Sequence, residues 1–158
     1  MRFILILFLH IVLFANSYNF DEYKYIKAVS SEFQKSGHID VKKNRTVIIY
    51  KEPSYKKIIK TDTNVTIEDL QGKLYHLKGK ANLYAKSFID IMTRLGNFKK
   101  LKSNRDFDVQ KEGDTYYITF KGDIGERIDK AEVYIKNSKV QSFKMFMPNE
   151  DTIKIVKK

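Results

Sequence analysis

The chain has 158 residues, enough for one domain, and it combines a formal charge of +11 with no cysteine. The absence of cysteine excludes a disulfide scaffold, thiol chemistry and lipid attachment at a cysteine. Lysine supplies most of the positive charge and is spread along the chain, whereas nucleic-acid-binding proteins concentrate basic residues on one face. We therefore expect a solvated lysine-rich surface, compatible with anionic lipid headgroups, and we do not expect nucleic acid as a partner.

The first 17 residues have the pattern of a secretory signal peptide. Arg2 provides the positive start, residues 3–14 form an apolar run, and Ala15 and Ser17 are small residues near a cleavage point. The run is too short for a comfortable transmembrane helix. We expect a cleaved signal at residues 1–17, a single domain over residues 18–158 and export to a bacterial periplasm. An uncleaved membrane anchor is the alternative.

Hydrophobic spacing predicts a helix and then strands in the first half. In residues 21–33 apolar side chains recur three and four positions apart, which is typical of a short amphipathic helix. Short strands follow at residues 45–53, 55–61, 64–70 and 73–79. The pair Gln71-Gly72 indicates a hairpin turn between the last two of them.

The second half begins with a stronger helix signal. Residues 81–96 carry an apolar stripe at helical spacing and end on Gly96, a typical helix terminator. Two hairpins follow, at residues 107–122 with a turn at Glu112-Gly113 and at residues 128–147 with a turn at Asn137-Ser138, and a last strand covers residues 151–158. The expected class is α+β, a strongly curved antiparallel sheet with two helices covering its concave face.

Sequence motifs for catalysis and metal binding are absent. The sequence contains no nucleophile elbow, glycine-rich phosphate loop or zinc signature, and His38 and His76 have no plausible second ligand at metal spacing. We therefore expect a protein that is not an enzyme, with no catalytic residue, metal or cofactor.

Large apolar side chains are abundant: the chain has 11 Phe, 10 Tyr and 4 Met. Aromatic and methionine side chains form adaptable walls for an acyl chain, although a solid core is an equal alternative. Phe146 has the opposite strand parity from its neighbours, which suggests a bulge or a contact on the convex face. The candidate ligand-binding residues are Tyr84, Phe88, Ile91, Met92, Tyr116, Ile118, Phe120, Val133, Ile135, Phe143, Met145 and Met147.

Three segments resemble those of one family. Residues 30–36 resemble its helix-to-strand stretch, residues 48–77 its strand, proline, strand and turn-aromatic run, and residues 126–156 its closing hairpin and final strand. In the second segment, the family's turn and the aromatic residue after it correspond to Gln71-Gly72-Lys73 and Tyr75. The order of elements over nearly all of residues 18–158 is similar to that of the LolA-type outer-membrane lipoprotein carriers.

The resemblance implies an incomplete antiparallel β-barrel with helices across its concave side. It also implies a monomeric periplasmic chaperone that shields lipoprotein acyl chains, receives them from an inner-membrane ABC exporter and delivers them to an outer-membrane acceptor. Family members commonly carry arginine before a strand-ending proline, where it holds the lid; Glu52 and Pro53 occupy this lid-contact position here.

Three alternatives to lipoprotein carriage remain open. The first is a LolA-like binding protein for another lipid. The second is an interaction module with a filled core and a basic surface. The third is a secreted nucleic-acid binder that uses Tyr and Lys on an open sheet.

Overall fold

The computed structural model describes residues 17–96, 102, 103, 105 and 107–158. The expected signal peptide therefore lies outside the described residues except for Ser17. The elements in chain order are β1 (Tyr18–Ile26), the 3-10 helix η1 (Lys27–Val29), β2 (Ser31–Lys42), β3 (Arg45–Glu52), β4 (Lys56–Lys60), β5 (Val65–Glu68), β6 (Leu74–His76), α1 (Gly79–Gly96), β7 (Phe107–Glu112), β8 (Thr115–Phe120), α2 (Gly122–Gly125), β9 (Lys130–Lys136), β10 (Lys139–Phe146) and β11 (Thr152–Lys157).

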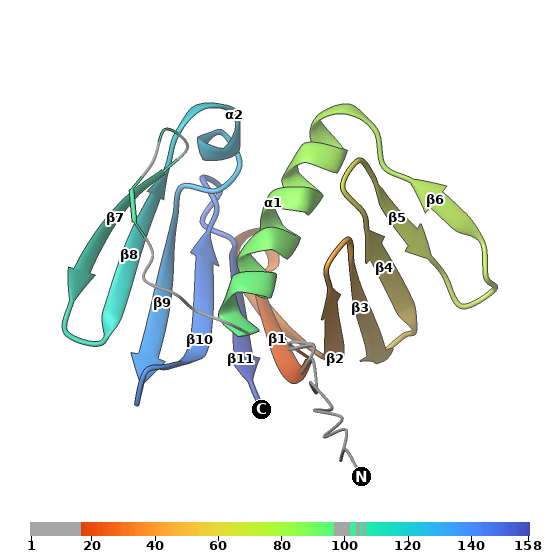
Figure 1. Ribbon diagram of the computed structural model, residues 1–158, viewed down its shortest axis with the longest axis horizontal. Helices are drawn as coiled ribbons and strands as arrows, with labels where there is room; N and C mark the ends of the chain where they lie inside the picture. Colours follow the sequence, from red (N-terminus) through yellow and green to blue (C-terminus); the bar gives the residue numbers. More distant parts are fainter. Residues whose placement is uncertain (1–16, 97–101, 104, 106) are drawn as a thin grey trace, which may run out of the picture.

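Eleven strands of the described chain form one open antiparallel sheet, in the order β6-β5-β4-β3-β2-β1-β11-β10-β9-β8-β7. The order follows the chain except at its centre, where β1 pairs with both β2 and β11. The sheet has two wings, β1–β6 and β7–β11, which meet where β1 pairs with β11 (Figure 1). The predicted large antiparallel sheet is confirmed; it is consistent with the expected curvature, and it does not close.

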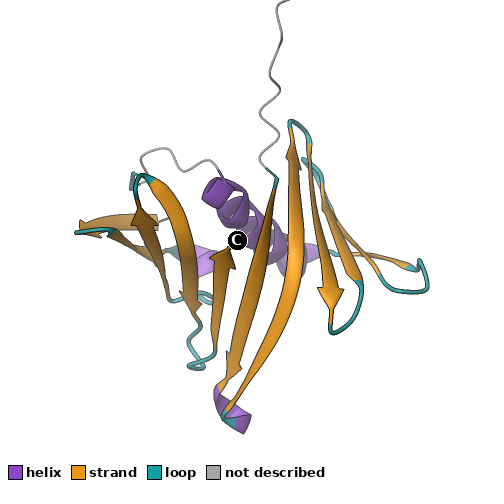
Figure 2. Ribbon diagram, turned by 90° about the horizontal axis from the view of Figure 1, so that it is seen from below, coloured by secondary structure: helices purple, strands orange, loops and turns teal. Residues whose placement is uncertain are grey.

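Helix α1 lies on the concave side of the bent sheet, between the two wings (Figures 1 and 2). It contacts β5 of one wing and β10 of the other. Two covering helices were predicted, but α1 is the only helix longer than four residues within the described chain, because α2 spans one turn and η1 three residues. No helix among the described residues has the length and apolar character needed to cross a membrane.

The predicted helix at residues 21–33 is wrong. This segment forms most of β1, the short η1 and the start of β2. The spacing of three and four between its apolar residues is coincidental. Because alternate residues of a strand point to opposite faces, Phe20 and Glu22 lie on the concave face and Tyr23 on the other. Pairing with β11, more than a hundred residues away, overrides the local pattern.

The predicted hairpins are confirmed. The β9–β10 turn has Asn137 and Ser138 at φ 53° and 59°, the pair of positive angles of a two-residue type I′ turn. Gly113, at φ 56°, begins the β7–β8 turn. Strand β11 and helix α1 also lie where they were expected, within two residues at each end.

A bulge aligns the apolar side chains of β10. The register with β9 shifts between Val140 and Ser142, so that Val140 and Phe143, three residues apart, are both buried. Phe146 lies after the bulge on the opposite face from Met145. There the ammonium groups of Lys130 and Lys144 lie 4.6 and 4.8 Å from its ring centroid. Phe146 pairs in continuous register with Lys130 and Thr152, so the bulge of this strand lies upstream of it.

Candidate ligand-binding site beneath helix α1

Polar contacts attach α1 to the β1–β6 wing. Asn82 Oδ1 accepts a hydrogen bond from the Val65 amide at 2.8 Å, and Asn82 Nδ2 donates to the Thr63 carbonyl at 3.2 Å. One turn further along, Lys86 Nζ donates to the Asp62 carbonyl at 2.7 Å. Lys60 Nζ lies 2.6 Å from Asp90 Oδ1 in an ion pair. The hydrogen bonds to the Thr63 and Asp62 carbonyls are exposed to water, whereas the one from the Val65 amide is partly buried.

Two further contacts fix the helix elsewhere. Lys80 pairs with Glu126 of the opposite wing at 3.2 Å, with both side chains exposed. The Tyr18 hydroxyl donates to the Met92 carbonyl at 2.6 Å in a buried hydrogen bond. Burial raises the pKa of Tyr18, so its hydroxyl remains a donor at neutral pH.

The underside of α1 is apolar. Ile89 and Met92 are fully buried, and Ala85 and Phe88 are half-buried against the same core. Burial of this underside contributes to holding α1 on the sheet, at about 25 cal/mol per Å² of apolar surface. An apolar ligand placed between α1 and the sheet would give these side chains apolar contacts in place of those with the sheet.

The structure brings most of the sequence-predicted residues together on the concave face. Six are buried: Met92, Ile118, Phe120, Val133, Phe143 and Met145. Four are half-buried against them: Phe88, Tyr116, Ile135 and Met147. Tyr84 is half-buried outside this cluster, with Arg127 stacked 5.4 Å from its ring centroid, and the side chain of Ile91 lies outside the described residues.

Glu52 and Pro53, the expected lid-contact position, are exposed at the end of β3. No hydrogen bond or ion pair joins Glu52 to the described part of α1.

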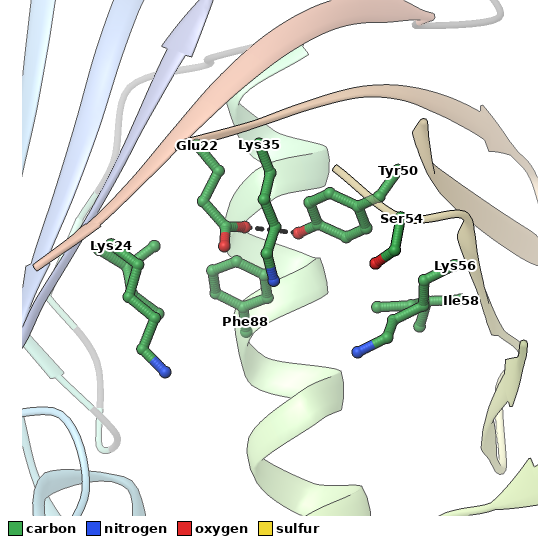
Figure 3. Close-up of a pocket in the computed structure, with 9 residues that line it drawn as sticks. Glu22, Lys24, Lys35, Tyr50, Ser54, Lys56, Ile58 and Phe88 are labelled. Atoms are coloured by element: carbon green, nitrogen blue, oxygen red, sulfur yellow. Dashed lines mark hydrogen bonds between the residues drawn. The ribbon is translucent and has the colours of Figure 1, made fainter. Parts of the chain in front are cut away.

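An open pocket of about 240 Å³ lies between α1 and the β1–β4 face (Figure 3). Its lining residues are Glu22, Lys24, Lys35, Tyr50, Ser54, Lys56, Ile58, Phe88 and Ile153. Of the predicted residues whose side chains are described, Phe88 alone lines it. Ile58, Phe88 and Ile153 also pack against the apolar core, so the pocket directly adjoins that core.

Glu22 and Tyr50 form the buried polar part of the pocket wall. The Tyr50 hydroxyl donates to Glu22 Oε2 at 2.6 Å, and both residues are buried (Figure 3). Burial, followed by the charge of Glu22, raises the pKa of Tyr50 well above its usual value. Tyr50 therefore stays protonated and supplies the hydrogen bond that a buried carboxylate needs.

Three lysines also line the pocket: Lys24 of β1, Lys35 of β2 and Lys56 of β4. None forms an ion pair with a carboxylate of the described residues. Lys35 Nζ lies 5.6 Å from the centroid of the Tyr50 ring, beside the Glu22–Tyr50 pair. The pocket thus combines apolar side chains, one hydrogen-bonded carboxylate and three ammonium groups.

Sequence reasoning missed these lysines for two reasons. Lysine at alternate strand positions indicates a solvent-facing pattern, and the segment containing Lys24 was predicted as a helix. The alternation Phe20, Glu22, Lys24 is the signal that could have placed them, because it puts both charged side chains on the same face as a fully buried phenylalanine.

No group of three or more His, Cys, Asp or Glu side chains that could hold a metal ion occurs within the described ranges. His38 contacts Asn19 and His76 contacts Thr66, each through one ring nitrogen. Both histidines therefore have local hydrogen-bonding partners.

Comparison with known proteins found no matching family model and no matching curated protein. Among solved structures, a LolA superfamily protein of Nitrosomonas europaea aligns with 8% identity over 90% of this chain and 83% of its own, at a TM-score of 0.42. A DUF1329 family protein of Desulfovibrio piger aligns with 8% identity over 92% and 85%, at 0.45. An outer-membrane lipoprotein-sorting protein domain of Vibrio parahaemolyticus aligns with 5% identity over 89% and 82%, at 0.44. Similarity at this level does not assign the chain to a family.

Proposed function

We propose that this protein is a non-enzymatic carrier that binds the acyl chains of lipoproteins, or of another lipid, between α1 and the concave face of the sheet. The observation that supports it is the pocket beside α1, which is open to solvent and adjoins the apolar core through Ile58, Phe88 and Ile153. An acyl chain that enters there meets apolar side chains from both the helix and the sheet. Each methylene group that it buries contributes about 0.8 kcal/mol.

The size of the pocket implies that α1 moves. At about 240 Å³ it is smaller than ordinary ligand pockets, which span roughly 300–1,000 Å³. A long acyl chain therefore needs space that Met92 and its neighbours occupy here. Displacement of α1 from the sheet breaks a limited set of polar contacts, and the ligand replaces the lost apolar contacts. Release of the lipid reverses the exchange.

The proposed setting is based on the sequence resemblance. We propose a monomer in the periplasm that receives lipoproteins from an inner-membrane ABC exporter and passes them to an outer-membrane acceptor. Such a shuttle needs reversible burial of the lipid and no chemical step.

A binding titration with a matched pair of variants tests the proposal. Protein purified without detergent and stripped of lipid is titrated with a fluorescent long-chain fatty acid, and we expect one ligand per chain. Ile58→Asn places an amide in the pocket wall, whereas Ile59→Asn makes the same change on the opposite face of β4, where Ile59 faces Val47. Ile58→Asn should weaken binding about tenfold, equivalent to about 1.4 kcal/mol, and Ile59→Asn should not.

Two outcomes would contradict the proposal. If the stripped protein takes up no fatty acid and no lipid co-purifies by mass spectrometry, the interior is filled and an interaction module is favoured. If the protein instead binds single-stranded nucleic acid with steep salt dependence, the nucleic-acid alternative is favoured.

A further inference from the structure

We propose that the pocket beside α1 selects amphiphiles with an anionic headgroup, a phosphate or a carboxylate, and that Lys24, Lys35 and Lys56 bind this group. The inference rests on the proposed function, because the apolar half of the ligand is the acyl chain beneath α1. It adds to that function a binding site for the headgroup and a preference for ligands with a negative charge.

Strand register places the three lysines on one face. Lys35 lies opposite Glu22, and Lys56 lies opposite Tyr50. Lys24 lies opposite Ile153 on β11, another pocket residue. Directly opposed residues of antiparallel strands share a face, so all three ammonium groups belong to the concave side that α1 covers. Figure 3 shows Lys24, Lys35 and Lys56 around one pocket, with Phe88 of α1 among them.

The charges at this pocket are unbalanced. Three lysines line it with one carboxylate, and Glu22 is already hydrogen-bonded to Tyr50. Two other lysines of β4 are paired: Lys57 with Glu68 at 2.9 Å and Lys60 with Asp90 at 2.6 Å. Like charges that share a partly enclosed site repel one another, and an anion between them relieves that repulsion. Within β4, Lys56 therefore differs from its two neighbouring lysines in having no carboxylate partner among the described residues.

The distribution of polarity fits an amphiphile. Ile58, Phe88 and Ile153 supply the apolar contacts, and the lysine ammonium groups and the Ser54 hydroxyl supply hydrogen-bond donors. Lysine binds phosphate or carboxylate as a mobile point charge, which tolerates different headgroups on the same type of chain. A neutral headgroup would leave the lysines without a counter-charge.

Ligands with one acyl chain and different headgroups test the inference. The stripped protein is titrated with a lysophosphatidic acid, a fatty acid and an uncharged monoacylglycerol of equal chain length, and with inorganic phosphate alone. We expect the two anionic amphiphiles to bind about tenfold or more tightly than the neutral one, with a preference that shrinks as salt is added. Inorganic phosphate should bind far more weakly than either.

The variant Lys24→Gln/Lys35→Gln/Lys56→Gln should lose this preference while keeping its affinity for the monoacylglycerol. The matched control, Lys43→Gln/Lys139→Gln/Lys154→Gln, removes the same charge at exposed positions outside the pocket lining and should keep the preference. Equal wild-type binding of anionic and neutral ligands would overturn the headgroup inference alone. If inorganic phosphate binds as tightly as the amphiphiles, the inference that the anion is part of a lipid is wrong. If no amphiphile binds at all, the proposed function is wrong.

Discussion

At the scale of single residues, Gly37 allows the aromatic wall behind the pocket to form. A Cβ atom at this position would lie 2.5 Å from Phe20 Cζ and 3.0 Å from the Ile49 carbonyl oxygen. The fully buried Phe20 ring meets Tyr50 edge to face, with centroids 5.6 Å apart. Tyr50 in turn donates to Glu22, so the absence of a side chain at Gly37 supports the polar pair of the site.

Gly37→Ala should therefore lower the free energy of unfolding by about 1–3 kcal/mol, because overpacking forces Phe20 away from its position. Urea denaturation measures this change. Phe20→Leu removes the atom in conflict, so the alanine should cost less in that background than in the wild type. An equal cost in both backgrounds would show that the contact with Phe20 is not the cause.

Asp21 lies beside Glu22 on β1 but points to the other face. Lys158 Nζ lies 2.8 Å from Asp21 Oδ1, and the Ser36 hydroxyl donates to the same oxygen at 2.7 Å. The hydrogen bond from Lys158, followed by that from Ser36, lowers the pKa of Asp21 from its ordinary value of 3.8. The charged form is therefore preferred more strongly in the folded protein than in the unfolded chain.

A lowered folded-state pKa stabilises the fold above the unfolded value of 3.8, and the stabilisation is lost as the pH falls through the folded value. Asp21→Asn should reduce stability at neutral pH by about 1 kcal/mol or less, because Lys158 is half-exposed. The difference from the wild type should disappear in strong acid. Thermal unfolding across pH measures it, and a difference that is constant with pH would contradict the assignment.

At the scale of elements, α1 is a cover with an apolar underside and polar attachments at its edges. The attachments reach the β4–β5 turn, β4 and the β8–β9 connection, so the helix spans both wings. If lipid uptake requires α1 to leave the sheet, a covalent link across one attachment should block it. The chain contains no cysteine, so two introduced thiols are unique.

The pair Lys60→Cys/Asp90→Cys replaces an ion pair whose charged atoms are 2.6 Å apart. Bridging the two thiols with a cleavable bifunctional reagent should reduce fatty-acid uptake by about tenfold or more, and cleavage of the bridge should restore it. The same variant with each thiol blocked separately is the control, because it lacks the ion pair but leaves α1 free. Unchanged uptake by the bridged protein would show that α1 does not move.

At the scale of the whole molecule, the open sheet has a strong centre and two weak margins. Residues 20–25 of β1 are paired on both sides, with β2 and with β11. At one margin β6 pairs at three positions only and is exposed, and at the other β7 has a neighbour on one side. Local opening should therefore be easiest at the margins, where fewer contacts are lost.

Amide hydrogen exchange should be slowest in β1, β2, β10 and β11 and fastest in β6 and β7, by about a hundredfold or more between the extremes. Mass spectrometry of the exchanged protein measures this order. Added fatty acid should slow exchange in α1 and leave β7 unchanged. Uniform exchange along the sheet would contradict a stable centre with weak margins.

Much of the fold could be predicted because its signals are local. Asn137-Ser138, Gly113 and Gln71-Gly72 indicate turns through their backbone preferences, and the period of 3.6 that indicates α1 lies within one segment. The segment at residues 21–33 could not be predicted in this way, because β1 is set by its pairing with β11 at the other end of the chain. The parity of Phe143 and Met145 was predicted correctly, since strand alternation is also local.

Of the residues that line the candidate pocket only Phe88 was predicted, together with much of the apolar cluster that adjoins it. The sequence by itself determined two faces for most strands, the apolar stripe of α1 and the excess of lysine, because these depend on residue type and short-range spacing. Only the tertiary structure decided which face α1 covers and which lysines share a pocket. Lys24, Lys35 and Lys56 lie on three strands, and their meeting depends on strand register and sheet curvature, which no short stretch of sequence encodes.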